Sequence, residues 1–175
     1  SLGYKLWMDG NLLKEGQAQA GAGVEAALTL TRGMHHMKAV ATNSAGRSQF
    51  VYCDFWAGSD VVNAVSPKAV MKDAQTVSVS WTAPQRGNHD GYFDPSLVTY
   101  TVTRQPDAKV VYDGCATSFD DKEVADLQMG YYYYEVAAKV AGEYGDKVRT
   151  NVVQVGSALK LPYDQPFNDE VAAKT

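Results

Sequence analysis

The 175-residue sequence lacks the marks of several common protein classes. It has only two cysteines, and no apolar run approaches the roughly 18 residues of a membrane span. Its N-terminus has neither the basic nor the apolar region of a signal peptide. Its 16 Lys and Arg residues are dispersed and are outnumbered by 20 Asp and Glu residues, which gives a formal net charge of −4. Because nucleic-acid binding needs a basic face, we expect no nucleic-acid partner, and we expect no membrane insertion.

Patterns that bind metals are also scarce. His35 and His36 are adjacent and face opposite sides of a strand, so they cannot share a metal ion, while His89 is alone in a loop. The loop Asn88–Asp94 places three oxygen-bearing side chains near a glycine, but calcium needs about six to eight oxygens and the EF-hand spacing is absent. A loop held by Asx turns is favoured, with cation binding as the lesser alternative. The sequence therefore predicts no metal and no cofactor.

Catalytic motifs are missing as well. Neither Cys53 nor Cys115 has a partner motif for nucleophilic catalysis, and no phosphate-binding glycine loop opens a helix. The acidic stretch 120–123, Asp-Asp-Lys-Glu, is predicted to be a solvated loop, because acid–base work needs a concave pocket with raised pKa values. We therefore expect the chain not to be an enzyme.

The most informative stretch is residues 127–142, LQMGYYYYEVAAKVAG. Its alternation puts Tyr132, Tyr134, Val136 and Ala138 on one side of a strand. A tyrosine that follows a Leu-x-x-Gly corner, as Tyr132 does, commonly ties down the penultimate strand of a β-sandwich by a hydrogen bond from its hydroxyl to the preceding backbone. The stretch therefore predicts a β-sandwich.

The same pattern occurs earlier, in residues 30–46, LTRGMHHMKAVATNSAG, where His35 takes the place of the corner tyrosine. Two copies predict an all-β chain with two sandwich modules in tandem and no helix longer than about two turns. We place the modules at residues 1–57 and 66–156, with a short linker at 58–65 that allows limited flexing. Because each module holds one cysteine, Cys53 and Cys115 are predicted to be free and partly buried.

The first module is predicted to be incomplete. A hairpin turns at Asp9-Gly10-Asn11, and further strands are expected at residues 24–30, 35–41 and 48–55. These make five strands, two fewer than a seven-stranded sandwich has. We expect this module to be truncated at its N-terminus, or to obtain the two strands from elsewhere.

The second module is predicted to be complete. Besides the tyrosine strand it has expected strands at residues 69–71, 77–81, 98–103, 110–112, 117–119 and 148–155. Trp81 is expected to pack beside Tyr100 and Tyr132 in its core.

Residues 66–156 resemble a fibronectin type III domain through SVSWTAP, LVTYTVTR and Leu127-x-x-Gly-x-Tyr. The stretch GNHDGYFDPSLVTYTVTRQPD also resembles type III domains in large secreted or surface proteins of Bacteroidetes-type bacteria. Residues 1–57 are similar to type III and bacterial Ig-like domains, and residues 161–167 resemble the start of a jelly-roll module, so residues 157–175 are expected to begin a following domain. The resemblance implies non-catalytic modules of a longer exported protein, located outside the cell or on its surface.

Alternation also predicts a possible binding face on the first module. Trp7, His36, Phe50 and Tyr52 are expected to share one outer surface, which we call the aromatic face. Such a patch usually marks a contact. Three interpretations compete: packing on a neighbouring domain or a second copy, burial in the core if the strand phase is reversed, or binding of a glycan or protein.

Two functions follow from these observations. The favoured hypothesis is a structural segment whose modules space and present neighbouring domains of the parent protein. The alternative is a binding module that holds a glycan or a protein partner through the aromatic face.

Overall fold

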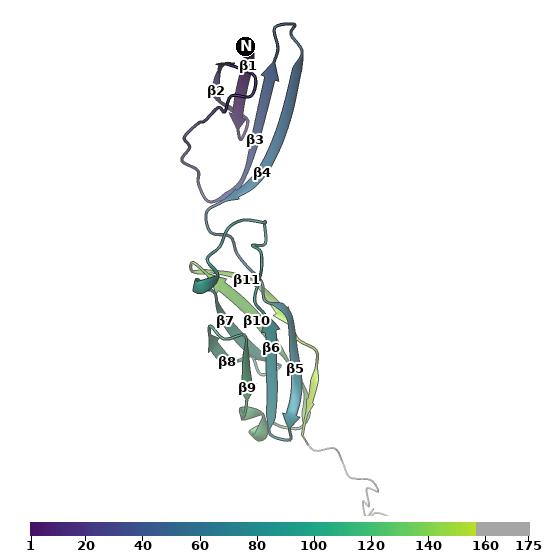
Figure 1. Cartoon of the computed structure of the whole chain (residues 1–175). Coiled ribbons are helices and arrows are strands. Elements are labelled where there is room, and N and C mark those ends of the chain that lie inside the picture. The colour runs from purple at the N-terminus through teal and green to yellow at the C-terminus, as the bar shows by residue number, and fades with distance from the viewer. Residues whose placement is uncertain (157–175) are drawn as a thin grey trace, which may run out of the picture.

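The structure is a computed structural model, and it describes residues 1–156. These residues form two β modules placed end to end, with β1–β4 in the upper module and β5–β12 in the lower one in the view of Figure 1. Within the described residues the only helical segments are two 3-10 turns, η1 (Pro95–Leu97) and η2 (Glu123–Asp126). The all-β prediction is confirmed.

The first module is one antiparallel sheet in the order β2-β1-β3-β4. Its strands are β1 (Leu2–Met8), β2 (Asn11–Ala18), β3 (Gly33–Thr42) and β4 (Ser48–Ala57). Asp9 and Gly10 join β1 to β2 with φ of 50° and 80°, the left-handed values that a tight hairpin turn requires. β3 and β4 pair without interruption from Gly33–Ala57 to Thr42–Ser48.

The strand expected at residues 24–30 is absent, so this prediction was wrong and the module has four strands instead of five. Residues 19–32 form no helix or strand although their apolar residues alternate. A strand needs a neighbour for its backbone hydrogen bonds, and the described residues contain no second sheet in this module that could supply one.

The second module is a sandwich of two antiparallel sheets. One sheet contains β5 (Val65–Asp73), β6 (Thr76–Thr82) and β9 (Ser118–Asp121). The other follows the order β11-β10-β7-β8, with β7 (Thr99–Gln105), β8 (Lys109–Gly114), β10 (Gly130–Val140), β11 (Glu143–Arg149) and a short β12 (Val153–Val155) beside the start of β10.

The single closing strand expected at 148–155 is instead divided into β11 and β12. β11 ends at Arg149, where the hydroxyl of Thr150 accepts the N–H of Tyr134 at 3.0 Å in place of a backbone carbonyl. The chain then resumes pairing with β10 at Val153.

The core of the second module lies between its two sheets. Trp81 packs on Tyr100 with ring centroids 5.1 Å apart, as predicted. Its other ring partner is Tyr112, with centroids 5.9 Å apart, whereas Tyr132, the second partner expected, is buried elsewhere in the same core. Val102 and Val136, directly opposite each other on β7 and β10, are fully buried. Burying such apolar side chains is the main stabilising contribution in a sandwich of this size.

The predicted tyrosine corner is present. The hydroxyl of Tyr132 donates to the carbonyl of Gln128 at 3.1 Å, four residues earlier. The alternation of this strand is confirmed too, because Tyr132, Tyr134, Val136 and Ala138 are all buried, whereas Tyr131 is exposed.

The solvated loop predicted at residues 120–123 was wrong, because residues 120 and 121 belong to β9 and Asp121 is buried. Its carboxylate accepts from Arg104 at 2.8 Å and from the hydroxyl of Tyr134 at 3.0 Å. Burial alone would lower the pKa of the Arg104 guanidinium, but its bonds to Asp107 and Asp121 outweigh burial and raise that pKa above its ordinary value. Burial raises the pKa of the Tyr134 hydroxyl, and the nearby Asp121 raises it more. Asp121 lies opposite Val77 in the sheet, so its side chain points inward.

Cys53 and Cys115 are free thiols, as predicted, but both are exposed where partial burial was expected. Cys53 lies on the side of β4 that no second sheet covers, and Cys115 follows the end of β8. The expectation for residues 157–175 lies outside the described residues.

Candidate functional site

The two modules meet at three side chains, Trp56, Asp60 and His89, which we call the joint. Trp56 is near the end of β4, Asp60 follows that strand, and His89 belongs to the loop between β6 and β7. The indole of Trp56 stacks on the imidazole of His89 with ring centroids 4.0 Å apart and an interplanar angle of 8°. An aromatic ring of the first module is therefore in parallel contact with a ring of the second.

Asp60 is fully buried and holds the other side of the joint. One carboxylate oxygen accepts from Nδ1 of His89 at 2.7 Å. The other accepts from the backbone N–H groups of His89 at 2.7 Å and Gly91 at 3.1 Å, and the N–H of Asp60 donates to the carbonyl of Tyr92 at 2.8 Å. A buried carboxylate with several donors is stable in place, whereas a buried carboxylate without them is costly.

These bonds decide the charge state of Asp60. Burial by itself would raise the pKa of its carboxyl, but the hydrogen bonds from the side chain and backbone of His89 and from Gly91 outweigh burial and lower the pKa. Asp60 is therefore ionised at neutral pH and pairs electrostatically with His89 when that ring is protonated.

Residues 58–64, which connect β4 of the first module to β5 of the second, pack along the second module. Val62 and Ala64 are buried in that module's core. The side-chain oxygen of Asn63 accepts from the N–H of Asp146 at 2.7 Å and from Nδ2 of Asn88 at 3.0 Å. Residues 58–65, expected as a linker, are thus held by core packing and by hydrogen bonds to β11 and to the β6–β7 loop, although their composition is that of a flexible segment.

Arg32 adds a second crossing from the first module. Its Nε donates to the carbonyl of Ser59 at 2.7 Å, and its guanidinium forms an ion pair with Glu143 of β11 at 3.1 Å. The guanidinium also lies 5.8 Å from the centre of the Trp56 ring, within range of a cation–π interaction. Arg32 thus contacts the second module, the intervening segment and the stacked indole.

Two glycines permit this close packing. A Cβ at Gly91 would lie 2.8 Å from the side chain of Trp56, and one at Gly87 would clash with the carboxylate of Asp60. Any larger residue at either position would displace a group of the joint.

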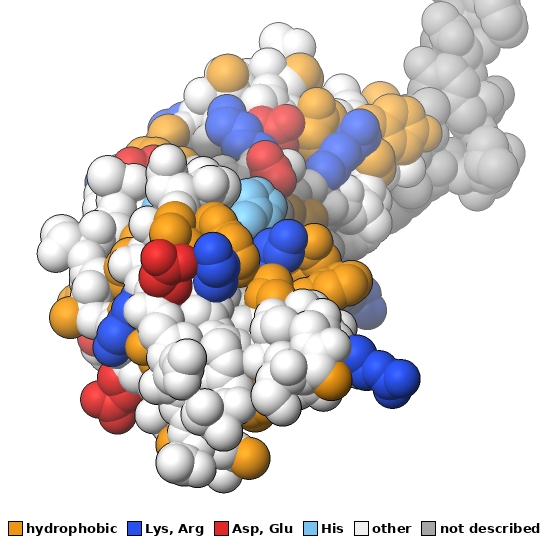
Figure 2. Space-filling model, turned by 90° about the horizontal axis from the view of Figure 1, so that it is seen from above, with side chains coloured by type: hydrophobic (Ala, Val, Ile, Leu, Met, Phe, Trp, Pro, Cys, Tyr) orange, Lys and Arg blue, Asp and Glu red, His pale blue; other side chains and the backbone are white. Residues whose placement is uncertain are grey.

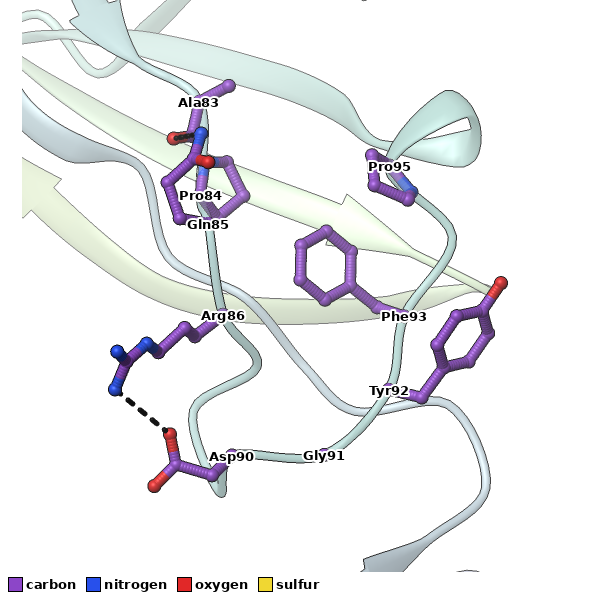
Figure 3. Close-up of a pocket in the computed structure, with 9 residues that line it drawn as sticks. All are labelled: Ala83, Pro84, Gln85, Arg86, Asp90, Gly91, Tyr92, Phe93 and Pro95. Atoms are coloured by element: carbon purple, nitrogen blue, oxygen red, sulfur yellow. Dashed lines mark hydrogen bonds and ion pairs between the residues drawn. The ribbon is translucent and has the colours of Figure 1, made fainter.

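The loop that carries His89 is also folded around its own apolar side chain. Figure 3 shows Phe93 directed toward Pro84 and Pro95, and Tyr92 directed away. Phe93 is buried, Tyr92 is 75% exposed, and the loop surrounds an open hollow of about 590 Å³.

The acids of this loop are bonded to protein donors. Asp94 accepts from the N–H of Ser96 at 2.9 Å, an Asx turn as predicted, and Asp90 lies 3.8 Å from Arg86. No group of three or more potential metal ligands occurs within residues 1–156.

The aromatic face lies on the opposite side of the first sheet from Cys53. Trp7, Lys38 and Tyr52 are direct cross-strand partners, so their side chains share one face. The Lys38 ammonium lies 5.3 Å from the Trp7 ring centre and 5.6 Å from that of Tyr52. His36 joins them in lining a hollow of about 390 Å³.

Phe50 extends this surface, since its ring contacts Tyr52 edge-on at 5.5 Å, and both are more than 60% exposed. His36 pairs with Asp54 at 2.7 Å. Seen end-on, the first module mixes hydrophobic side chains with both signs of charge (Figure 2). The structure therefore places all four residues named from the sequence on one face.

Sequence reasoning missed the joint. Asp60 lies in a Gly-Ser-Asp stretch with the composition of a linker, and Trp56 reads as the end of an alternating strand. The available signal was a tryptophan followed four residues later by an aspartate. The loop that contacts them, which carries His89, is about 30 residues further along the chain.

No family model and no curated protein matches this sequence. Among solved structures, the chain is similar to domains A168–A170 of titin, with 10% identity over 87% of this chain and 53% of that one, and a TM-score of 0.45. It is also similar to domains d3–d4 of the rat CD45 extracellular region, with 12% identity over 81% of this chain and 74% of that one, and a TM-score of 0.46. The chain spans about half the length of the titin fragment. No helix in residues 1–156 is long and apolar enough to span a bilayer.

Proposed function

We propose that the chain is a non-catalytic spacer that holds neighbouring domains of its parent protein at a defined separation and orientation. The observation that carries the proposal is the joint: Trp56 of the first module stacks on His89, which Asp60 fixes through a fully buried carboxylate. A flexible tether needs no such contacts, because Gly- and Ser-rich chain alone provides reach.

A spacer also needs modules that keep their own shape. The second module has a two-sheet core, and the segment leading into it is bound through Val62 and Asn63. With Arg32 crossing to Glu143, contacts reach the second module from two separate parts of the first. Such an arrangement restricts both bending and rotation.

The native cysteines allow a direct test, because Cys53 lies in the first module, Cys115 in the second, and both are exposed. Spin labels on these two thiols report the distance across the joint by double electron–electron resonance. We expect one narrow distance distribution for the unmodified chain and a broad one for Asp60→Asn, which removes the charge and replaces one of the two accepting carboxylate oxygens with a donating amide group.

Asp54→Asn is the matched control, since Asp54 forms an equally short pair with His36 on the exposed face, away from the joint. It should leave the distribution narrow. A broad distribution in the unmodified chain, or an unchanged one in both Asp60→Asn and Trp56→Ala, would refute the spacer function.

The second candidate is binding through the aromatic face. The observation in its favour is the hollow beside Trp7, Lys38 and Tyr52, where aromatic rings accompany polar groups on an exposed surface. Exposed aromatics of this kind can stack on the apolar faces of a sugar ring or anchor a protein. The test uses native gels that contain a polysaccharide that retards the unmodified chain. The double substitution Trp7→Ala and Tyr52→Ala should abolish that retardation. Tyr131→Ala, which removes an exposed aromatic of the second module, should not.

The location of the protein follows from the same proposal. A rigid tandem of β modules without catalytic groups suits an extracellular or cell-surface protein, with neighbouring domains of the parent protein as its partners. Detection of the intact parent protein by antibody on unpermeabilised cells, or in the culture medium, would support this location, and its confinement to the cytoplasm would contradict it.

A further inference from the structure

The first module has one layer where the second has two. The sheet order β2-β1-β3-β4 repeats the order β8-β7-β10-β11, and the strands follow the chain in the same sequence. In the second module the inner side of that sheet packs on β5, β6 and β9. No strand of the first module takes their place in residues 1–57.

The uncovered side of the first sheet is apolar. Leu6, Ala39 and Val51 lie opposite one another across β1, β3 and β4, as Val102 and Val136 do in the second module. We call the side that carries these three residues, together with Met37 and Cys53, the inner face. Val51 is 60% exposed, whereas Val102 and Val136 are fully buried. A stable sheet buries its apolar face against a second layer, so this face lacks its cover.

The irregular residues 19–32 of the first module reach the inner face at Val24. Val24 from residues 19–32 joins Tyr4, Leu6 and Ala39 around a hollow of about 350 Å³. At the corresponding place in the second module, between β8 and β10, the chain forms β9, which is hydrogen-bonded to β6. Residues 24–30 have the alternation for a strand but no counterpart of β6 beside them.

We propose that the inner face is covered by two further antiparallel strands of the same polypeptide, and that residues 24–30 pair with them as a third strand. Because β5 and β6 come before β7, the covering strands come before β1 in the parent chain. They must present alternate apolar side chains to Leu6, Ala39 and Val51, since no charged residue lies at the centre of this face.

Thiol labelling tests the proposal, because Cys53 lies on the inner face and Cys115 does not. The rate of maleimide labelling is compared between the 175-residue chain and the parent polypeptide with roughly 35 additional residues before Ser1, the length needed for two strands and their connection. We expect Cys53 to react about tenfold more slowly or less in the longer form, because labelling then requires local opening, while the rate at Cys115 stays the same.

Two outcomes would overturn the proposal. Equal labelling of Cys53 in both forms would show that the added residues leave the face open. Protection of Cys53 in the 175-residue chain that increases with protein concentration would show that a second copy occupies the face instead.

A pair of variants gives an independent readout. Val51 and Tyr52 are adjacent, about equally exposed, and on opposite faces of β4. Val51→Lys should lower the melting temperature of the longer form by about 5 °C or more, while Tyr52→Lys should change it little. Equal effects of the two substitutions in the longer form would contradict the proposal.

Discussion

His35 of the first module and Tyr132 of the second occupy the same structural position. Each ring lies two residues after a glycine at the start of its strand, and each bonds to a backbone carbonyl four residues earlier, His35 to Thr31 at 2.7 Å and Tyr132 to Gln128 at 3.1 Å. A histidine in place of the tyrosine keeps the corner bond but makes the corner side chain titratable. The other ring nitrogen of His35 faces the carboxylate of Asp9 at 2.7 Å, so both nitrogens act as donors.

The first prediction concerns pH. The bond to the Thr31 carbonyl, and then the bond to Asp9, raise the pKa of His35 above the ordinary value of 6.5. A group whose pKa is raised by folding stabilises the folded state fully below its unfolded pKa and loses that effect as pH rises through the folded pKa. The difference in melting temperature between the unmodified chain and His35→Gln should therefore be largest below pH 6.5 and shrink as the ring deprotonates.

Its control is His36→Gln, an exposed histidine on the next residue that is paired with Asp54. The same pH dependence in that variant would mean that the effect does not belong to the corner. A melting difference for His35→Gln that is constant from acid to alkaline pH would contradict the titratable corner.

The second prediction concerns the tyrosine corner itself. Tyr132→Phe removes only the hydroxyl that bonds to Gln128, so the free energy of unfolding of the second module should fall by about 1 kcal/mol. Tyr131→Phe, at the exposed neighbouring position, should change it little. Urea denaturation followed by tryptophan fluorescence measures both, and equal effects would mean that the corner bond contributes nothing.

The third prediction concerns the buried pair Arg104–Asp121. Arg104→Met leaves the Asp121 carboxylate buried without its cation, which should cost about 3–5 kcal/mol in the free energy of unfolding. Combining it with Asp121→Leu should recover part of this loss, because an apolar pair tolerates burial. By contrast Lys5→Ala, which breaks the exposed pair with Glu15, should cost less than about 1 kcal/mol. A small effect of Arg104→Met in denaturant titrations would disprove the pairing.

The fourth prediction concerns the joint. Gly91→Ala places a methyl group 2.8 Å from the side chain of Trp56, so the stack on His89 must shift and the distance distribution between labels on Cys53 and Cys115 should move or broaden. The expected loss of stability is about 1–3 kcal/mol. Gly23→Ala, which meets open space, is the matched control. An unchanged distribution for Gly91→Ala would show that the two modules do not depend on this contact.

Acid should loosen the joint by the same logic of linkage. The lowered pKa of Asp60 means that its contribution is present above the ordinary value of 3.8 and is lost as pH falls through the folded value. The distribution of distances between labels on Cys53 and Cys115 should therefore broaden in acid. In Asp60→Asn the width of that distribution should no longer depend on pH. If the broadening persists in Asp60→Asn, another group controls it.

The local structure of the chain follows from short-range patterns in its sequence. A two-residue alternation along a strand indicates which side is buried, so the pattern alone assigns Tyr132, Tyr134 and Val136 to the core. The Leu-x-x-Gly-x-Tyr corner and the Asp9-Gly10 hairpin are equally local, because each depends on residues a few positions apart. The placement of Trp7 and Tyr52 on one face follows from the same alternation.

Contacts between residues far apart in the chain are visible only once the strands and loops are packed in three dimensions. Asp60 and His89, or Arg104 and Asp121, carry no pattern that marks them as partners, since the bond depends on how distant loops and strands pack. The missing strand at residues 24–30 has the same cause. Its alternation is correct, but a strand exists only beside a neighbour that can take its backbone hydrogen bonds, and no sequence segment supplies that condition for itself.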